Sequence, residues 1–332
     1  MFPSTPRDSD AWDEDATRDV ARSAPGRGHF YAGDREDERK PSGDGDDAEF
    51  EEEEVRVVPV RRQLSVAIAG FAGLLGAGLV LGAQTSGPDA RLPYAIVLFG
   101  VQLLYVLAFT MAIRPPAAYT VAGISLVAGA LADYAAVTDD SPGVMSLLYV
   151  LGGGFVAALV GQAIRPEDRL RLRDALGGTF LVVLGPVCLA LLIVLTRRPA
   201  GTQAVLMCLG AVGVTLLVAH LTDAVFPKPR IAPQVPRGAT GIVLGAMLGT
   251  FGAAALGSVL VLPFTPGKGA ILGLVVAGIA ALVDLAVNYS EAGRGLAGDA
   301  PTFWVARHMQ GPLGAFALAV PATYILAVFV LS

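Results

Sequence analysis

The chain has 332 residues, of which 54% are hydrophobic and 16% are charged. Soluble globular domains are less apolar and carry about 25% charged residues, so an ordinary soluble domain is excluded. The charge is divided unevenly, with a net charge of −11 in residues 1–54 and +6 in residues 55–332. The acidity therefore belongs to the N-terminal segment, and the composition also excludes a basic nucleic-acid-binding protein and a secreted disulfide scaffold.

Residues 1–62 are predicted to form a disordered, acidic cytoplasmic tail. Asp, Glu, Arg, Gly, Ser and Pro dominate this segment, and it has almost no aliphatic residues before Val55. Such a segment buries too little apolar surface to offset the entropy lost on ordering. The acidic run Glu51–Glu54 also repels itself. Two interpretations stay open: a solvating tail, or a docking arm for a basic partner or for the chain's own basic loops.

Residues 63–332 are predicted to form an all-α, polytopic membrane domain. Nine apolar runs follow one another, each of about 18–24 residues, which is enough to cross ~30 Å of hydrocarbon as a helix. Proline and glycine mark several of the joints between them. The runs cover residues 64–83, 92–113, 117–138, 144–164, 175–195, 203–226, 239–262, 270–288 and 311–331.

The orientation of the predicted spans follows from the positive charges between them. With the N-terminus inside, the inside segments of residues 55–332 carry 13 Lys and Arg residues and the outside segments carry 4. Short cytoplasmic loops are enriched in Lys and Arg, so the count predicts a cytoplasmic N-terminus and an outside C-terminus at Ser332. We expect a multi-pass protein of a bacterial plasma membrane.

Ionisable residues inside a membrane are costly and are candidates for function. The predicted spans contain four that stand out: Asp133, His220, Asp223 and Asp284. The topology places the last three near the inner surface, next to a loop that carries Lys228, Arg230 and Arg237. We therefore expect His220 and these three cations to bind a phosphate-bearing headgroup, with Asp284 as the ligand of any divalent ion. The alternative is ordinary interfacial residues with no ligand.

Small residues recur every four positions along the seventh predicted span, at Gly241, Gly245, Gly249, Ala253 and Gly257. A stripe of this kind lets another backbone approach closely. Three interpretations stay open: helix packing within one chain, a dimer face, and a groove for lipid tails.

Three motifs in residues 206–332 resemble the C-terminal half of the CDP-diacylglycerol synthase (phosphatidate cytidylyltransferase) family. The stretch Phe226–Val235 resembles the family's F-G-K-h-x-h-x-P-x-I, Ala281–Leu285 resembles its a-x-G-D-L, and Pro321–Tyr324 resembles its closing a-P-x-x-Y. About 25 residues of cytoplasmic loop are expected between the last two spans. The resemblance implies a multi-spanning enzyme that makes CDP-diacylglycerol from CTP and phosphatidate with a divalent metal. If the chain is active, it implies magnesium and the catalytic candidates Asp223, Asp284 and Asp299.

Several signature residues of that family are missing. Asn288–Arg294 stands where the family has a Lys-Arg pair, and Gly314–Ala317 stands where it has an acidic pair that is thought to hold metal. Nucleotidyl transfer needs metal ions and cationic side chains that neutralise the negative charge of the triphosphate. We therefore expect a relative without catalysis that binds anionic phospholipid or a partner protein. The first alternative is a divergent cytidylyltransferase. The second, a transporter of lipid or small solutes, ranks lower because the polar residues lie near the membrane faces.

Overall fold

The computed structural model describes residues 58–85, 91–139, 143–164, 172–260 and 262–329. These ranges contain nine helices that are long and apolar enough to cross a membrane, and no strand pairing beyond one bridge between Arg230 and Gly238. The predicted fold class of the membrane domain is therefore confirmed. Most of the predicted disordered tail, residues 1–57, lies outside the described ranges. The helices are α2 (Arg62–Thr85), α3 (Arg91–Ile113), α4 (Ala118–Thr138), α5 (Val144–Ala163), α6 (Leu172–Thr196), α7 (Gly201–Val225), α8 (Ala239–Val259), α9 (Pro266–Leu296) and α10 (Trp304–Phe329).

Most helix ends lie within a few residues of the predicted ones, but α9 and α10 differ. The cytoplasmic loop expected between residues 288 and 311 shrinks to residues 297–303, because α9 continues for two turns beyond the apolar run and α10 begins two turns earlier. Apolar length marks only the part of a helix that lies in hydrocarbon. The extension of α9 is polar, and Glu291 and Arg294 pair within it at a spacing of three residues.

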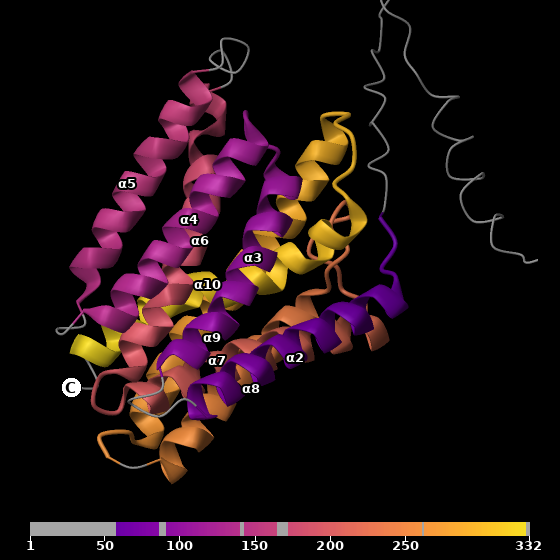
Figure 1. Ribbon diagram of the computed structural model, residues 1–332. Helices are drawn as coiled ribbons and strands as arrows, with labels where there is room; N and C mark the ends of the chain where they lie inside the picture. Colours follow the sequence, from indigo (N-terminus) through magenta and orange to yellow (C-terminus); the bar gives the residue numbers. More distant parts are fainter. Residues whose placement is uncertain (1–57, 86–90, 140–142, 165–171, 261, 330–332) are drawn as a thin grey trace, which may run out of the picture. The chain divides into compact units, whose positions relative to one another are not determined.

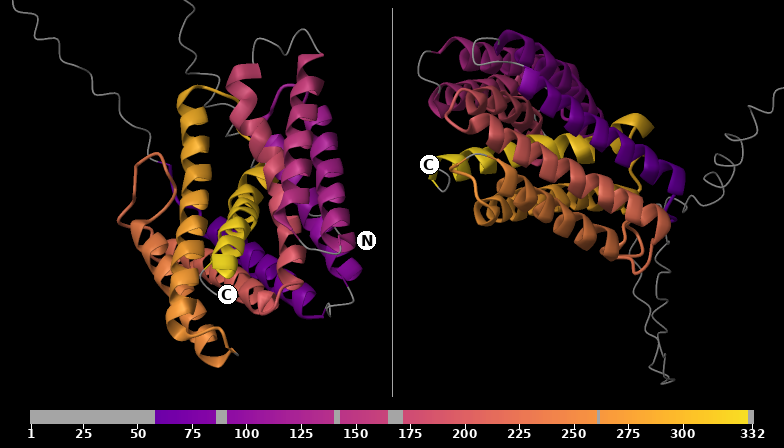
Figure 2. Two further views of the ribbon diagram at one scale, coloured as in Figure 1. Left: turned by 90° about the vertical axis from the view of Figure 1, so that its left-hand side faces the viewer. Right: turned by 90° about the horizontal axis from the view of Figure 1, so that it is seen from below.

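The helices form two groups on either side of α10 (Figures 1 and 2). In the first group, α2 packs against α7, α7 against α8, and α8 against α9. In the second group, α3, α4, α5 and α6 pack against one another. The last helix, α10, contacts members of both groups: α2, α7 and α9 on one side and α3 and α6 on the other. It is buried on all sides from Gln310 to Ala317, as expected for a helix in the centre of a bundle.

The small-residue stripe of α8 faces other helices of the same chain. A Cβ atom at Gly245 would overlap the carbonyl oxygen of Thr215 in α7, and one at Gly257 would lie 2.5 Å from the carbonyl oxygen of Thr265, next to α9. All five residues of the stripe are buried. Helix packing within one chain is thus the interpretation that applies, and the stripe offers no exposed surface to a second copy or to a lipid tail.

The outward faces of the peripheral helices are apolar. On α8, Val243, Met247 and Phe251 are 56%, 62% and 68% exposed, and they share one face at a spacing of four residues. On α5, Leu148 and Val156 are similarly exposed. Exposed apolar surface on this scale is unfavourable in water and favourable against lipid tails. The domain therefore has the surface of a multi-pass membrane protein.

Candidate functional site

Three of the four ionisable residues predicted inside the membrane meet at one place in the structure. His220 and Asp223 lie one turn apart near the C-terminal end of α7, and Asp284 lies in α9 where the apolar part of that helix ends. Arg237, which lies two residues before the first residue of α8, contacts them with its side chain. The exposed fraction of each of the four residues is between 1% and 3%.

A single guanidinium group connects the two carboxylates. Arg237 Nη1 lies 2.6 Å from Asp223 Oδ2, and Arg237 Nη2 lies 2.8 Å from Asp284 Oδ2. Asp223 also accepts a hydrogen bond of 3.1 Å from the backbone N–H of Gly238. Buried carboxylates need partners of this kind, because an unpaired charge in a low-dielectric interior is strongly destabilising. Arg237 thus joins α7, α9 and the start of α8 in one ion-pair network.

The network also determines the tautomer of His220. Arg237 Nη1 lies 2.8 Å from His220 Nδ1, and arginine can only donate, so Nδ1 must be the acceptor. The proton of the imidazole is therefore assigned to Nε2, which lies 3.3 Å from Asp284 Oδ1 and donates to it. His220 is then neutral, and the four residues together carry one net negative charge.

Glycine residues make the space that these carboxylates occupy. A Cβ atom at Gly238 would lie 2.8 Å from Asp223 Oδ1, and one at Gly241 would overlap the same oxygen. A Cβ atom at Gly311 in α10 would lie 2.7 Å from Asp284 Oδ1. The close approach of α8 and α10 to the two aspartates therefore requires glycine at these three positions.

Three residues of the cluster, His220, Arg237 and Asp284, line a cavity of about 240 Å³, which we call the first cavity. Its walls come from the start of α2, the end of α7, the second half of α9 and the first turns of α10. Arg61, Arg307 and His308 line it, and the indole of Trp304 lies edge-on against His308 with ring centroids 5.4 Å apart. The first cavity opens at the face where α2 and α10 begin, which the charge count predicts to be cytoplasmic.

Only two of the four residues predicted to bind a headgroup line the first cavity. His220 and Arg237 do so, but Arg237 is buried and paired with two carboxylates, where a surface cation was expected. Lys228 is exposed and lies outside the lining. Arg230 instead donates a hydrogen bond of 2.5 Å to the carbonyl oxygen of Val58, at the start of the described chain.

Glu291 is the centre of a second ion-pair network, which the sequence did not predict. Its carboxylate pairs with Arg294, accepts a hydrogen bond of 2.8 Å from the hydroxyl of Thr302, and lies 3.7 Å from Arg307 Nη1. Arg294 also donates to the carbonyl oxygen of Ala112 at the end of α3. The available signal was the spacing of Glu291 and Arg294, which is typical of neighbours on one helix face.

The three catalytic candidates do not come together. Asp223 and Asp284 share Arg237, whereas Asp299 is exposed in the short loop after α9 and lines a different cavity. The described residues contain no group of three or more His, Cys, Asp or Glu side chains arranged to hold a metal ion. Each of the two buried carboxylates already has one oxygen on Arg237 and the other on Gly238 or His220, so the residues present do not fit this metal.

Asp133, the fourth intramembrane candidate, lies apart from the cluster in α4. It is buried and accepts a hydrogen bond of 2.9 Å from Gln102 Nε2 in α3. The same amide nitrogen lies 3.1 Å from the carbonyl oxygen of Pro186 in α6. Asp133 and Gln102 thus form a polar contact among three helices of the second group.

In comparisons with known proteins, no family model, no characterised protein and no solved structure matches the chain. The fold and the two cavities therefore provide the evidence about function, together with the motifs quoted above. They define a multi-pass membrane protein whose described residues form nine membrane-type helices. A buried ion-pair cluster lies next to an open cavity in it.

Proposed function

We propose that the chain is a non-catalytic, multi-pass relative of CDP-diacylglycerol synthase that binds the phosphate headgroup of an anionic phospholipid in the first cavity. The observation that carries this proposal is the position of Arg237. It bridges Asp223 and Asp284 and lines the first cavity together with Arg61 and Arg307. The proposed relationship to the family rests on the three motifs in residues 206–332.

The charge of the first cavity favours an anion. Arg237 is neutralised by its two carboxylates, and Glu291 is paired with Arg294. The arginines of the lining and of its ion pairs are Arg61, Arg237, Arg294 and Arg307, and the acids are Asp223, Asp284 and Glu291. With neutral histidines, this set carries one net positive charge. The N-termini of α2 and α10 lie at the same cavity, and helix N-termini attract phosphate groups through their unpaired N–H groups and dipole.

The volume and the lining suit a headgroup with the adjoining part of a lipid. The polar residues lie beside Leu64, Ile68 and Val287, which belong to membrane-spanning helices. A headgroup at this depth would meet arginine side chains, each of which contributes about 1 kcal/mol of attraction to anionic lipid near a membrane surface. Catalysis is not favoured, because an arginine holds the carboxylates that would have to bind metal for nucleotidyl transfer.

Lipid retention by the purified protein tests this proposal. The full chain, in nanodiscs of phosphatidylcholine with a minor fraction of phosphatidate, is expected to retain phosphatidate on transfer to detergent, as counted by native mass spectrometry. The double variant Arg61→Gln/Arg307→Gln should lose most of this retention, and higher salt should weaken it. Lys268→Gln, which removes a cation from the opposite end of α9, is the matched control. Equal retention by the double variant and the parent would contradict the proposal.

A further inference from the structure

Asp133 in α4 is a buried acid that the proposed headgroup site does not use. It is 6% exposed and lies five residues before the end of α4, which corresponds to about 7.5 Å along the helix axis. It therefore lies within a membrane-spanning helix, towards the side that the charge count predicts to be outside. No cation pairs with it among the described residues, in contrast to Asp223 and Asp284. An ionised carboxylate in such a place is strongly disfavoured.

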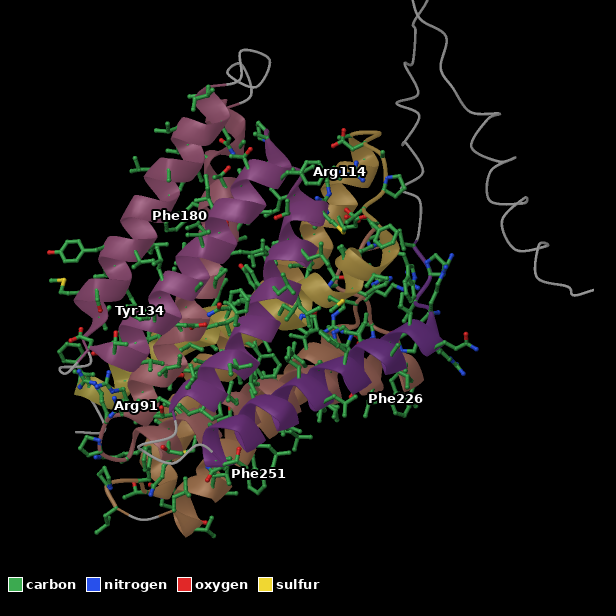
Figure 3. All side chains as sticks on the ribbon, in the orientation of Figure 1. Arg91, Arg114, Tyr134, Phe180, Phe226 and Phe251 are labelled. Atoms are coloured by element: carbon green, nitrogen blue, oxygen red, sulfur yellow. The ribbon has the colours of Figure 1, made fainter. Side chains whose placement is uncertain are left out.

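The helices that pack against α4 are α3, α5 and α6, and their cations have other partners. Arg91, the first residue of α3, donates a hydrogen bond of 3.2 Å to the carbonyl oxygen of Val137. Arg197, directly after α6, donates one of 2.8 Å to the carbonyl oxygen of Ala136. Figure 3 shows Arg91 and Tyr134 near the same end of the second group of helices. Both arginines thus bind the backbone at the end of α4.

The other titratable groups around Asp133 are uncharged at neutral pH. Helix α5 contains no charged residue. The described side chains of α3, α4, α5 and α6 otherwise include tyrosines and one thiol: Tyr94, Tyr105, Tyr119, Tyr134, Tyr149 and Cys188. These groups lose their protons only well above neutral pH. A charge on Asp133 would therefore be uncompensated within the described residues.

Two buried oxygen atoms at the contact between Asp133 and Gln102 have no hydrogen-bond partner in the described part of the chain. They are Asp133 Oδ2 and Gln102 Oε1. Gln102 lies in α3 and is 0% exposed. Buried polar atoms in proteins are nearly always paired, because an unpaired one loses its hydration without a replacement. The contact thus has two acceptors and lacks a donor for them.

The carbonyl oxygen of Pro186 in α6 determines which way the Gln102 amide faces. Gln102 Nε2 lies 3.1 Å from this oxygen and 2.9 Å from Asp133 Oδ1. A carbonyl oxygen can only accept, so the amide nitrogen must face it. Gly129, one turn before Asp133 in α4, makes room for the amide oxygen, since a Cβ atom there would lie 2.7 Å from Gln102 Oε1. The unpaired atom of the amide is therefore its oxygen, which is an acceptor.

We propose that Asp133 is a proton-binding site. A proton from water binds to Asp133 Oδ2, which changes this acceptor into a donor, and the resulting O–H donates to Gln102 Oε1. The acid and the amide then share two hydrogen bonds, and no charge stays buried. When the proton leaves, two acceptors again lack a donor, so the packing of α3 against α4 and α6 depends on pH. A metal ion suits the contact less, because it offers two unpaired oxygens where a hard cation takes about six ligands.

Infrared spectroscopy of the full chain in dodecyl maltoside, a detergent without carbonyl groups, tests this inference directly. A protonated carboxylic acid has a carbonyl stretching band that a carboxylate lacks. We expect this band in the parent at about pH 6, where exposed aspartates are ionised, and its loss in Asp133→Asn. Asp299→Asn, at an exposed aspartate, is the matched control and should keep the band. Gln102→Leu should keep the band but shift it, because it removes hydrogen bonds to the acid, and this shift assigns the band without Asp133→Asn.

The pH dependence of stability provides a second test. The folded chain holds a proton on Asp133 that the unfolded chain has released, so folding takes up one proton and stability falls as the pH rises. Relative to Asp133→Asn, the unfolding constant of the parent should rise by up to about tenfold per pH unit until the folded Asp133 ionises. Asp133→Asn reproduces the hydrogen bonds of the neutral acid, because its amide nitrogen donates where Oδ2 did. Its melting temperature at about pH 8 should therefore exceed that of the parent.

Three results would overturn the inference. The first is a parent without the acid band, as expected if an ordered water joins the two oxygens and Asp133 is ionised. The second is a band that persists in Asp133→Asn. The third is stabilisation of the parent by sodium but not by choline, lost in Asp133→Asn, which would identify a metal cation. Asp133 does not line the first cavity, so Asp133→Asn should leave phosphatidate retention unchanged, and the two proposals are tested independently.

Discussion

Arg237, in the loop before α8, places its Nη2 atom 2.8 Å from Asp284 Oδ2 in α9. Its other terminal nitrogen pairs with Asp223 in α7, so one side chain neutralises acids from two helices. In a site that holds a divalent ion, that ion would neutralise such carboxylates. Here an arginine does so, and the same groups thereby hold the ends of α7, α8 and α9 together.

Removing this arginine should destabilise the domain. Arg237→Gln leaves Asp223 and Asp284 buried without a cation, and breaking a buried pair in this way costs roughly 3–5 kcal/mol. We expect a clear fall in the melting temperature of the purified protein in detergent. Lys228→Gln, in the same loop but at an exposed residue, should leave it unchanged. A melting temperature for Arg237→Gln equal to that of the parent would show that the buried charges are neutralised in another way.

The stripe of α8 predicts a position-specific packing defect. A Cβ atom at Gly249 would overlap the Thr215 hydroxyl and lie 2.7 Å from the carbonyl oxygen of Ala211, so Gly249→Leu must push α7 and α8 apart. Overpacking of this kind typically costs about 1–3 kcal/mol. Gly252→Leu in the same helix is the control, because a Cβ atom there meets nothing within 4 Å. Equal thermal stability of the two variants would contradict the packing described for α8.

Nine crossings place the two ends of the chain on opposite sides of the membrane. A reporter that fluoresces only in the cytoplasm should be bright when fused before Met1 and dark when fused after Ser332, because the positive charges favour a cytoplasmic N-terminus. A reporter after Val225, the last residue of α7, should again be bright. Signal from the fusion after Ser332 would mean that one of the nine helices does not cross.

The proposed loss of catalysis is tested by turnover. Purified protein with CTP, phosphatidate and magnesium should form no CDP-diacylglycerol above a no-protein blank, because Asp223 and Asp284 are paired with Arg237 and Asp299 lies elsewhere. Product that depends on magnesium and disappears in Asp284→Asn would contradict this expectation. Such product would favour the alternative of a divergent cytidylyltransferase.

The sequence predicted the helices and part of the first cavity for identifiable physical reasons. The length of an apolar run depends on one segment of the sequence only, so all nine membrane helices could be predicted from these runs. His220, Asp223 and Asp284 could be placed at one face because each follows a long apolar run at a predictable end. Their contact with Arg237 could not be predicted, because it depends on how α7, α8 and α9 pack.

Other features depend on contacts that no single segment reveals. Glu291 lies in a polar stretch that hydropathy places in a loop, although it belongs to α9 and bonds Thr302 across the short turn to α10. Gln310 was expected next to the membrane surface, in the loop before the last span. Its place in the lining of a cavity appears only when α3, α6, α9 and α10 are assembled.

The proposed headgroup site is tested most directly by mapping where a phospholipid headgroup binds. A phosphatidate analogue with a photoreactive group beside the phosphate is irradiated with the full chain in nanodiscs, and the labelled peptides are mapped. We expect labelling of the first turns of α10, around Trp304 and Arg307, and of the start of α2 at Arg61, which together line the first cavity. Labelling confined to the exposed loop at Lys228, with none in α10, would contradict the proposed headgroup site.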